Sequence, residues 1–227
     1  MNRRILLVAL SLAVLLPLSA KTSSQVRVKD LTTELRHDPE GIDCATPRLS
    51  WKVESQENGT IQTAYQIRVW RKADGKTVWD SGKVASWQSV LVPYGGPDLE
   101  PETDYDWTVR VWTSAGVSPK AGVSGHWSTG LRDSTAWLGA EWIGISDREK
   151  LKEDPNHLPA KYLRKDFHLS DKVVSAKLYM SALGVGDASI NGTRVCEQMF
   201  MHPPVLFDKT VYYRTYDVTP LLKKGDN

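Results

Sequence analysis

The sequence predicts an all-β protein with two β-sandwich domains, the second of them incomplete. Short runs of alternating apolar and polar residues recur from Val26 onward, without a convincing helical period. Clusters rich in Gly, Pro, Asn and Asp separate these runs, as turns separate strands. All nine Trp lie between Trp51 and Trp142, which indicates that the front and the back of the chain are different modules.

Length, composition and charge exclude several classes of protein. A chain of 227 residues that is 41% hydrophobic has enough apolar residues for a packed core, so disorder is not expected. Lys and Arg number 29 against 27 Asp and Glu, and the balance is 27 against 27 without Arg3 and Arg4. A neutral chain gives no electrostatic reason to bind nucleic acid or an anionic membrane, and neither partner is expected.

Residues 1–20 have the pattern of a secretory signal peptide. Arg3 and Arg4 precede an apolar run over residues 5–16, and small residues lead up to Ala20. A membrane anchor is the alternative, but this run is shorter than the roughly 20 residues that span a bilayer. We therefore expect an exported protein, periplasmic or extracellular, with no membrane attachment after cleavage.

Cys44 and Cys196 are the only two thiols, so a zinc-finger type of metal site is excluded. In an exported chain the two could form a disulfide bond. Since they lie in different expected domains, we favour two separately buried thiols.

The first domain is expected over residues 25–131. One alternating strand is centred on Trp51 and another on Ile67. The apolar positions expected to face the core from these two strands are Leu49, Trp51, Val53, Tyr65, Ile67 and Val69.

The segment from Leu99 to Trp112 carries the most specific fold signal. Its Leu-x-Pro-x-Thr-x-Tyr turn leads into a strand in which Tyr105, Trp107, Val109 and Val111 share a face. This pattern is typical of a tyrosine corner, in which the phenol bonds the backbone of the preceding turn. With about seven short strands, the domain resembles a fibronectin type III domain, an immunoglobulin-like sandwich. That fold by itself implies no activity.

Four Trp are surplus to the expected core: Trp70, Trp79, Trp87 and Trp112. Trp70 and Trp112 lie off the apolar face of their strands. We therefore expect them to form a docking surface for another module, in preference to core packing or a sugar-stacking platform.

Residues 132–160 are expected to be a linker, and its apolar cluster over residues 137–144 to lie between the modules. Asp154, Asn156 and His157 lack the alternating spacing of a calcium loop, so we expect a solvated segment and no metal site. No cofactor motif is present. The scattered histidines are expected to be surface or structural residues: His37, His126, His157, His168 and His202.

The second module is expected over residues 161–227, with strands at 161–167, 174–183 and 210–218. Asn191-Gly192 predicts a hairpin turn between two short strands. Thr219 is expected to cap a helical turn that stops at Gly225.

The second module then ends where a returning strand would be expected. We infer an incomplete sandwich with an exposed apolar face and edge, in the front part of a longer protein.

Several motifs, taken in order, resemble the start of bacterial α-L-rhamnosidases of glycoside hydrolase family 78. In the first module these are residues 41–43, 47–51, 62–67, 79–84 and 105–112, and in the linker they are residues 142–144. In the second module they are residues 175–179, 190–192 with 194–195, and 216–219, which resemble the family's jelly-roll-like N-terminal β-sandwich domain. Loops 184–188 and 196–204 depart from the family pattern, so the resemblance implies no role for this module near the substrate.

The resemblance implies an enzyme that removes terminal α-L-rhamnose with inversion, using two carboxylic acids in a helical (α/α)6 barrel. In the family that barrel follows these modules, and the rhamnose-containing carbohydrate would bind there. We therefore assign no catalytic, ligand-binding or metal-binding residue, and expect no activity from the chain alone. The alternative is a free-standing carbohydrate-binding or adhesion module that uses exposed Trp.

Overall fold

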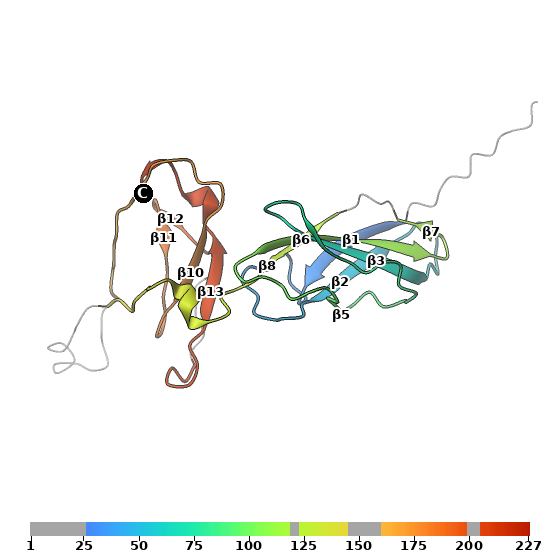
Figure 1. Ribbon diagram of the computed structural model, residues 1–227, viewed down its shortest axis with the longest axis horizontal. Coiled ribbons are helices and arrows are strands. Elements are labelled where there is room, and N and C mark those ends of the chain that lie inside the picture. The colour runs from blue at the N-terminus through green and yellow to red at the C-terminus, as the bar shows by residue number, and fades with distance from the viewer. Residues whose placement is uncertain (1–25, 119–122, 145–159, 199–204) are drawn as a thin grey trace, which may run out of the picture.

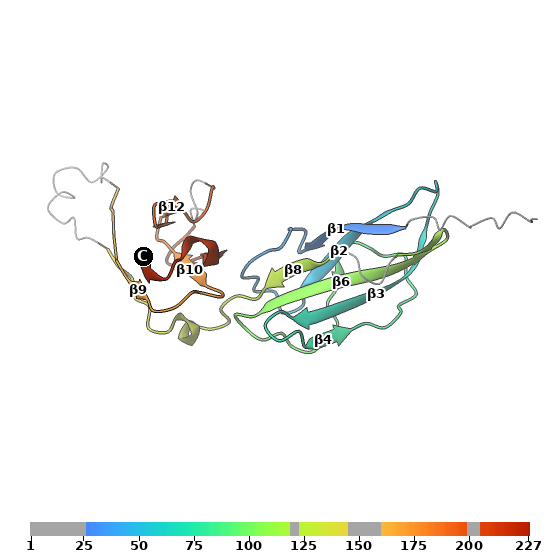
Figure 2. The same ribbon diagram turned by 90° about the horizontal axis from the view of Figure 1, so that it is seen from above.

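The computed structural model describes residues 26–118, 123–144, 160–198 and 205–227 as two β-rich bodies lying end to end (Figures 1 and 2). The expected signal peptide, the linker residues Asp154, Asn156 and His157, and also His202, lie outside the described residues. The helical elements in the described residues are two short 3-10 helices, one of four residues and one of three, so the fold is all-β. No helix in the described ranges is long and apolar enough to cross a membrane.

The first domain is a sandwich of two antiparallel sheets. One sheet has the order β1 (Arg27–Thr33), β2 (Arg48–Glu54) and β5 (Val92–Pro93). The other has the order β4 (Thr77–Asp80), β3 (Gln62–Arg71), β6 (Asp104–Thr113) and β7 (Gly116–Val117), and β8 (Gly125–Ser128) also pairs with β6. Two such sheets facing each other form the expected immunoglobulin-like sandwich.

Alternation along β2, β3 and β6 places the core where the sequence predicts it. These strands contribute to the core cluster the buried apolar side chains of Leu49, Trp51, Tyr65, Ile67, Val69, Tyr105, Trp107, Val109 and Val111, and Ala64 of β3 is buried as well. Val53 is half-buried and packs at the edge of this core. The indole Nε1 of Trp51 donates to Gln62 Oε1 at 2.9 Å, and the Gln62 amide donates to the carbonyls of Ser86 and Gln88. The Gln62 side chain thus links the loop that contains Ser86 and Gln88 to Trp51 in the core.

The tyrosine corner forms as predicted. The backbone N–H of Glu100 donates to the phenol oxygen of Tyr105 at 2.9 Å. The Tyr105 ring stacks on Trp127, with 5.6 Å between the ring centroids. The hydrogen bond and the ring stacking of Tyr105 hold the turn before β6 in place. They therefore also position Asp104, which is the first residue of β6.

The second domain consists of three short antiparallel ribbons. These ribbons pair β10 (Lys177–Ser181) with β13 (Tyr213–Asp217), β9 (His168–Leu169) with β14 (Gly225–Asp226), and β11 (Ser189–Ile190) with β12 (Thr193–Arg194). Between β11 and β12 lies the predicted turn, with Asn191 at φ 52° and Gly192 at φ 80°. Positive φ at both positions defines a type I′ hairpin turn, which confirms this prediction.

Two predictions for the second domain are wrong in detail. No strand forms over residues 161–167; pairing begins where Phe167 and Asn227 exchange backbone hydrogen bonds, ahead of β9. Thr219 does not cap the turn η2 (Thr219–Leu221) but is its first residue, and its hydroxyl accepts from the Ala176 N–H at 2.9 Å. The chain then enters β14 at Gly225 instead of ending at a helix stop.

The second domain has little core of its own. Among its described residues only Thr215 and Val218 are buried. Large apolar side chains are exposed in several segments: Tyr162, Val174, Leu183, Val185 and Leu206. A domain with so few buried side chains gains little stability from burial, so its contact with the first domain matters to it.

Candidate functional site: the interface between the two domains

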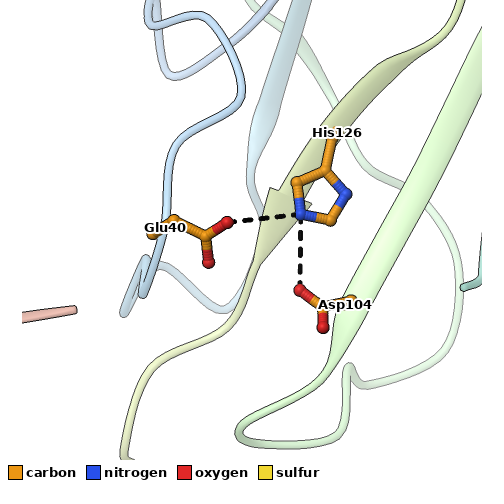
Figure 3. Close-up of side chains that lie close together, drawn as sticks. All are labelled: Glu40, Asp104 and His126. Atoms are coloured by element: carbon orange, nitrogen blue, oxygen red, sulfur yellow. Dashed lines mark ion pairs between the residues drawn. The ribbon is translucent and has the colours of Figure 1, made fainter. Parts of the chain in front are cut away.

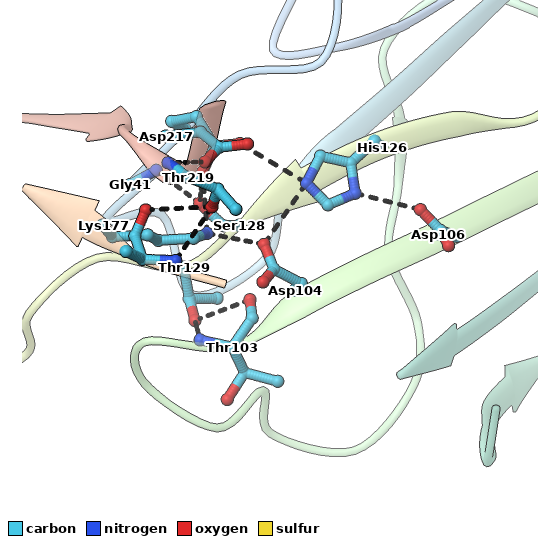
Figure 4. A network of polar contacts seen from close by, with 12 residues as sticks. Gly41, Thr103, Asp104, Asp106, His126, Ser128, Thr129, Lys177, Asp217 and Thr219 are labelled. Carbon is cyan, nitrogen blue, oxygen red and sulfur yellow. Dashed lines mark hydrogen bonds and ion pairs between the residues drawn. The ribbon is translucent and has the colours of Figure 1, made fainter. Parts of the chain in front are cut away.

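The interface lies at the end of the first sandwich where β6 begins and β8 ends. The chain crosses it through η1 (Ser134–Trp137), and β10 and β13 of the second domain lie beside that end (Figures 1 and 4). Figure 4 shows polar side chains of both domains converging there.

Lys177 makes two ion pairs across the interface. Its Nζ lies 2.7 Å from Glu40 Oε2 and 2.5 Å from Asp104 Oδ1, both in the first domain. The Lys177 side chain is only 12% exposed. A buried ammonium is tolerated when carboxylates pair with it and accept its hydrogen bonds, as here.

His126 lies behind the two carboxylates (Figure 3). Its Nε2 is 3.3 Å from Asp104 Oδ1 and 3.5 Å from Glu40 Oε1, and its Nδ1 is 2.9 Å from Asp106 Oδ1. The sequence predicts a surface or structural histidine, and His126 is 16% exposed and lies within a network of ion pairs. We call these five residues, Glu40, Asp104, Asp106, His126 and Lys177, the junction cluster.

The pKa values of the junction cluster favour its charged state. Burial opposes ionisation of Glu40, but hydrogen bonds from His126, Lys177 and Ser128 outweigh it and lower the pKa of Glu40 to about 2. Burial likewise opposes ionisation of Asp104, and His126 and Lys177 lower its pKa to about 2. For His126, burial disfavours the cation, but Asp104, Glu40 and Asp106 raise its pKa to about 10.

These shifts predict a bell-shaped dependence of stability on pH. The lowered carboxyl pKa values stabilise the fold fully above pH 4.5, and this contribution is lost as the pH falls towards 2. The raised pKa of His126 stabilises the fold fully below pH 6.5, and this contribution is lost as the pH rises towards 10. We expect the cluster's contribution to the free energy of unfolding to be greatest between pH 4.5 and 6.5.

Urea unfolding at a series of pH values checks this expectation, with His126→Gln and the exposed His37→Gln compared. The alkaline decline should flatten in His126→Gln and persist in His37→Gln. An identical alkaline decline in wild type and His126→Gln would contradict the assignment.

Glu40, Asp104 and His126 offer ligand atoms within 4.8 Å of one another, a spacing that a metal ion could bridge. The Lys177 ammonium, however, already lies at hydrogen-bonding distance from both carboxylates. The cluster is therefore an ion-pair network in which a side chain supplies the cation.

Tyr213 of β13 forms the second polar contact across the interface. The backbone N–H of Leu131 donates to its phenol oxygen at 2.8 Å, and the phenol lies 2.7 Å from Asp43 Oδ1, to which it donates. Burial and the Asp43 carboxylate raise the pKa of Tyr213, so the phenol stays protonated. The edge of Trp137 packs against the same ring, with 5.7 Å between centroids.

Two glycines allow the domains to approach closely. A Cβ on Gly41 would lie 2.0 Å from Thr215 Oγ1, and a Cβ on Gly130 would lie 2.2 Å from the Tyr213 phenol oxygen. Between them Ile42 forms a parallel bridge with Thr129. The motif at residues 41–43 is therefore part of the interface. Gly41 lets the backbone approach Thr215 closely, and the Asp43 carboxylate accepts a hydrogen bond from Tyr213.

The surplus Trp have different environments. Trp79 packs edge-on against Tyr94 beside the core, and Trp87 is 80% exposed. Lys83 and Arg110 lie over the ring of Trp112, at 4.7 and 5.0 Å from its centroid. Neither Trp70 nor Trp112 takes part in the hydrogen bonds and ion pairs described across the interface, so their docking role stays a prediction.

Two further expectations are wrong in part. The apolar cluster does not lie between the modules, because Leu138, Trp142 and Ile143 are 89%, 63% and 77% exposed; Trp137 alone packs on the second domain among these four. Both cysteines are free, as favoured, but Cys44 is exposed and Cys196 half-buried.

Fold and interface together define an immunoglobulin-like sandwich joined at a charged junction to a domain of short antiparallel β-ribbons. Residues 28–133 match the family model of the Rha78A-like N-terminal immunoglobulin domain. Residues 171–227 match that of the alpha-L-rhamnosidase N-terminal domain. The two domains of the chain are thus similar, in the same order, to the two N-terminal domains that these family models describe.

Known proteins resemble the chain along most of its length. It is 38% identical to an alpha-L-rhamnosidase of Streptomyces avermitilis over 191 residues, 76% of this chain and 18% of that protein. It is 34% identical to one from Formosa agariphila over 220 residues, 92% of this chain and 24% of that protein. The solved alpha-L-rhamnosidase of Dictyoglumus thermophilum superposes with a TM-score of 0.74 at 31% identity, over 91% of this chain and 25% of that one. The chain thus spans between 18% and 24% of the length of these two curated relatives.

Proposed function

We propose that the chain acts as the non-catalytic N-terminal portion of an exported α-L-rhamnosidase. The observation that carries this proposal is the match of both domains, in order, to the N-terminal part of proteins named alpha-L-rhamnosidase. The signal-like pattern of residues 1–20 supports export. Finding the chain in the cytoplasm with residues 1–20 uncleaved would contradict export.

The reaction served by the chain would be inverting hydrolysis of terminal α-L-rhamnose, with both carboxylic acids supplied by a following (α/α)6 barrel. A glycosidase's general acid needs a raised pKa. Glu40 and Asp104, the paired carboxylates at the interface, instead have lowered pKa values and are held by Lys177. This electrostatic environment favours a structural role for them.

An activity assay with nitrophenyl α-L-rhamnoside tests the proposal. The chain alone should release no nitrophenol. A chimera that joins residues 21–227 to the remaining part of the Streptomyces avermitilis relative should release it. Turnover by the isolated chain, or an inactive chimera that is correctly folded, would count against the proposal.

A second candidate function, carbohydrate binding, is favoured by one observation, the 80% exposure of Trp87. An exposed indole face packs well against the apolar face of a pyranose. Titration calorimetry with rhamnose and rhamnosyl oligosaccharides should give heat that Trp87→Ala abolishes. Absence of heat with every sugar would remove this candidate.

We also propose that Trp70 and Trp112 form a docking surface for a further module of the whole enzyme. Both lie half-buried on the outward face of the sheet that contains β3 and β6. In the chimera, Trp70→Ser with Trp112→Ser should lower thermal stability more than it does in the isolated chain. Equal losses in both would contradict docking.

A further inference from the structure

The first domain holds the carboxylates of the junction cluster in place without help from the second. The Ser128 hydroxyl donates to Glu40, and His126 lies between Glu40 and Asp104. The backbone N–H of His126 in turn donates to Asp38 Oδ1 at 2.8 Å. Because these partners all belong to the first domain, the two carboxylates form a preorganised position for a cation.

Within the junction cluster the first domain supplies three carboxylates and only one cationic side chain, His126. Three carboxylates, those of Glu40, Asp104 and Asp106, surround His126, which supplies one positive charge because its pKa is raised to about 10. The Lys177 ammonium adds the second, within 2.7 Å of two of the carboxylates. Removing one partner of such a buried pair leaves an uncompensated charge, which is strongly unfavourable.

The position of Lys177 relative to Tyr213 gives the interface two points of attachment. Lys177 is the first residue of β10, and Tyr213 is the first residue of the antiparallel neighbour β13, so the two lie at opposite ends of one ribbon. A single contact would leave the ribbon free to rotate about it. Two contacts so separated fix the rotation as well as the position.

We propose that Lys177 sets the orientation of the second domain, by filling a cation position that the immunoglobulin-like domain holds preformed. Tyr213 attaches β13 to the first domain, and Lys177 prevents rotation about that attachment. The two domains then behave as one rigid unit.

The two native thiols provide the test, since Cys44 lies in the first domain and Cys196 in the second. Nitroxide labels on both allow pulsed electron paramagnetic resonance to measure the distribution of distances between the domains. The wild-type chain should give one narrow peak. Lys177→Met, which keeps the length of the side chain and removes its charge, should lose that peak and give a broad distribution.

Lys172→Met is the matched control, because Lys172 is an exposed lysine of the same domain. It should keep the narrow peak, and Lys177→Arg should keep most of it. Glu40→Gln, in the first domain, should also broaden the distribution, and it decides the question if Lys177→Met fails to fold.

A broad wild-type distribution, or a narrow peak in folded Lys177→Met, would overturn the proposal. If Lys177→Met does not fold, a narrow distance peak in Glu40→Gln would overturn the proposal instead. None of these measurements depends on rhamnosidase activity, so the outcome is independent of the proposed function.

Discussion

Replacing Gly41 by alanine should detach the second domain from the first. A Cβ at this position would lie 2.0 Å from Thr215 Oγ1 and 2.6 Å from Thr215 Cβ, far inside van der Waals contact. Thr215 lies in β13, which also carries Tyr213, so relief of the clash would move the strand that anchors the second domain. Small-angle X-ray scattering should show that the maximum dimension of the molecule is larger than in wild type and that the two domains adopt a range of arrangements.

Gly59→Ala is the matched control for this change. Gly59 has φ +72°, close to the +65° of Gly41, but nothing lies within 4 Å of its Cβ position. Each alanine should cost about 1–2 kcal/mol of backbone strain in the left-handed region. Only Gly41→Ala should change the scattering, and Thr215→Gly should reverse that change. Identical scattering from Gly41→Ala and wild type would show that the interface tolerates the extra carbon.

Trp51→Ala should cause the largest loss of stability in the first domain. The side chain is 2% exposed and packs edge-on against Tyr65, with 5.3 Å between centroids. Truncation of a buried Trp costs about 3–5 kcal/mol. The side-chain oxygen Oε1 of Gln62 would also lose its hydrogen-bond donor, which adds about 1–3 kcal/mol to the loss of stability. Since a whole domain is stable by about 5–15 kcal/mol, this variant should be close to unfolding at room temperature.

Urea unfolding followed by far-ultraviolet circular dichroism measures this loss. The midpoint should fall and the slope should stay unchanged, as for a loss of stability without a change of denatured state. Trp87→Ala, which truncates an 80% exposed Trp of the same domain, should stay within about 0.5 kcal/mol of wild type. Equal effects of the two substitutions would contradict the core assignment of Trp51.

The sequence predicted the features that depend on neighbouring residues. Alternation placed Trp51 and Trp107 in the core, and the turn before Tyr105 predicted its bond to the Glu100 N–H. Asn191-Gly192 predicted its own hairpin, since few other pairs adopt two positive φ angles. In each case a local pattern of residue types is sufficient.

The interface was not predictable in the same way. Glu40, Asp104, His126 and Lys177 come from four separate segments, and each is an ordinary charged residue in its own segment. The pairing of Asp106 with His126 becomes visible only with the register of β6 against β8. The motif at residues 41–43 was the one part of the interface that stood out in the sequence. It stood out because its sequence resembles a family motif, and its contacts with the second domain were not predictable from that resemblance.

The strand expected at 161–167 shows how a local pattern misleads without a partner. Tyr162 and Leu163 have strand-forming side chains, yet they are 94% and 50% exposed, and no strand in the described part of the chain pairs with them. Pairing starts at Phe167, where Asn227 supplies backbone donor and acceptor. Strand formation here is decided by the hydrogen-bonding partner rather than by propensity.

The uneven distribution of Trp has an optical consequence. Every Trp precedes the second domain, and among the described residues Trp137 is the one Trp in ring contact with an aromatic residue of that domain, Tyr213. Intrinsic Trp fluorescence therefore reports almost entirely on the immunoglobulin-like domain, and the second domain emits only through its tyrosines. A denaturation curve recorded by fluorescence would miss an early loss of the second domain, which circular dichroism would detect. Divergence of the two curves would reveal domains that unfold separately, and coincidence would reveal a single cooperative unit.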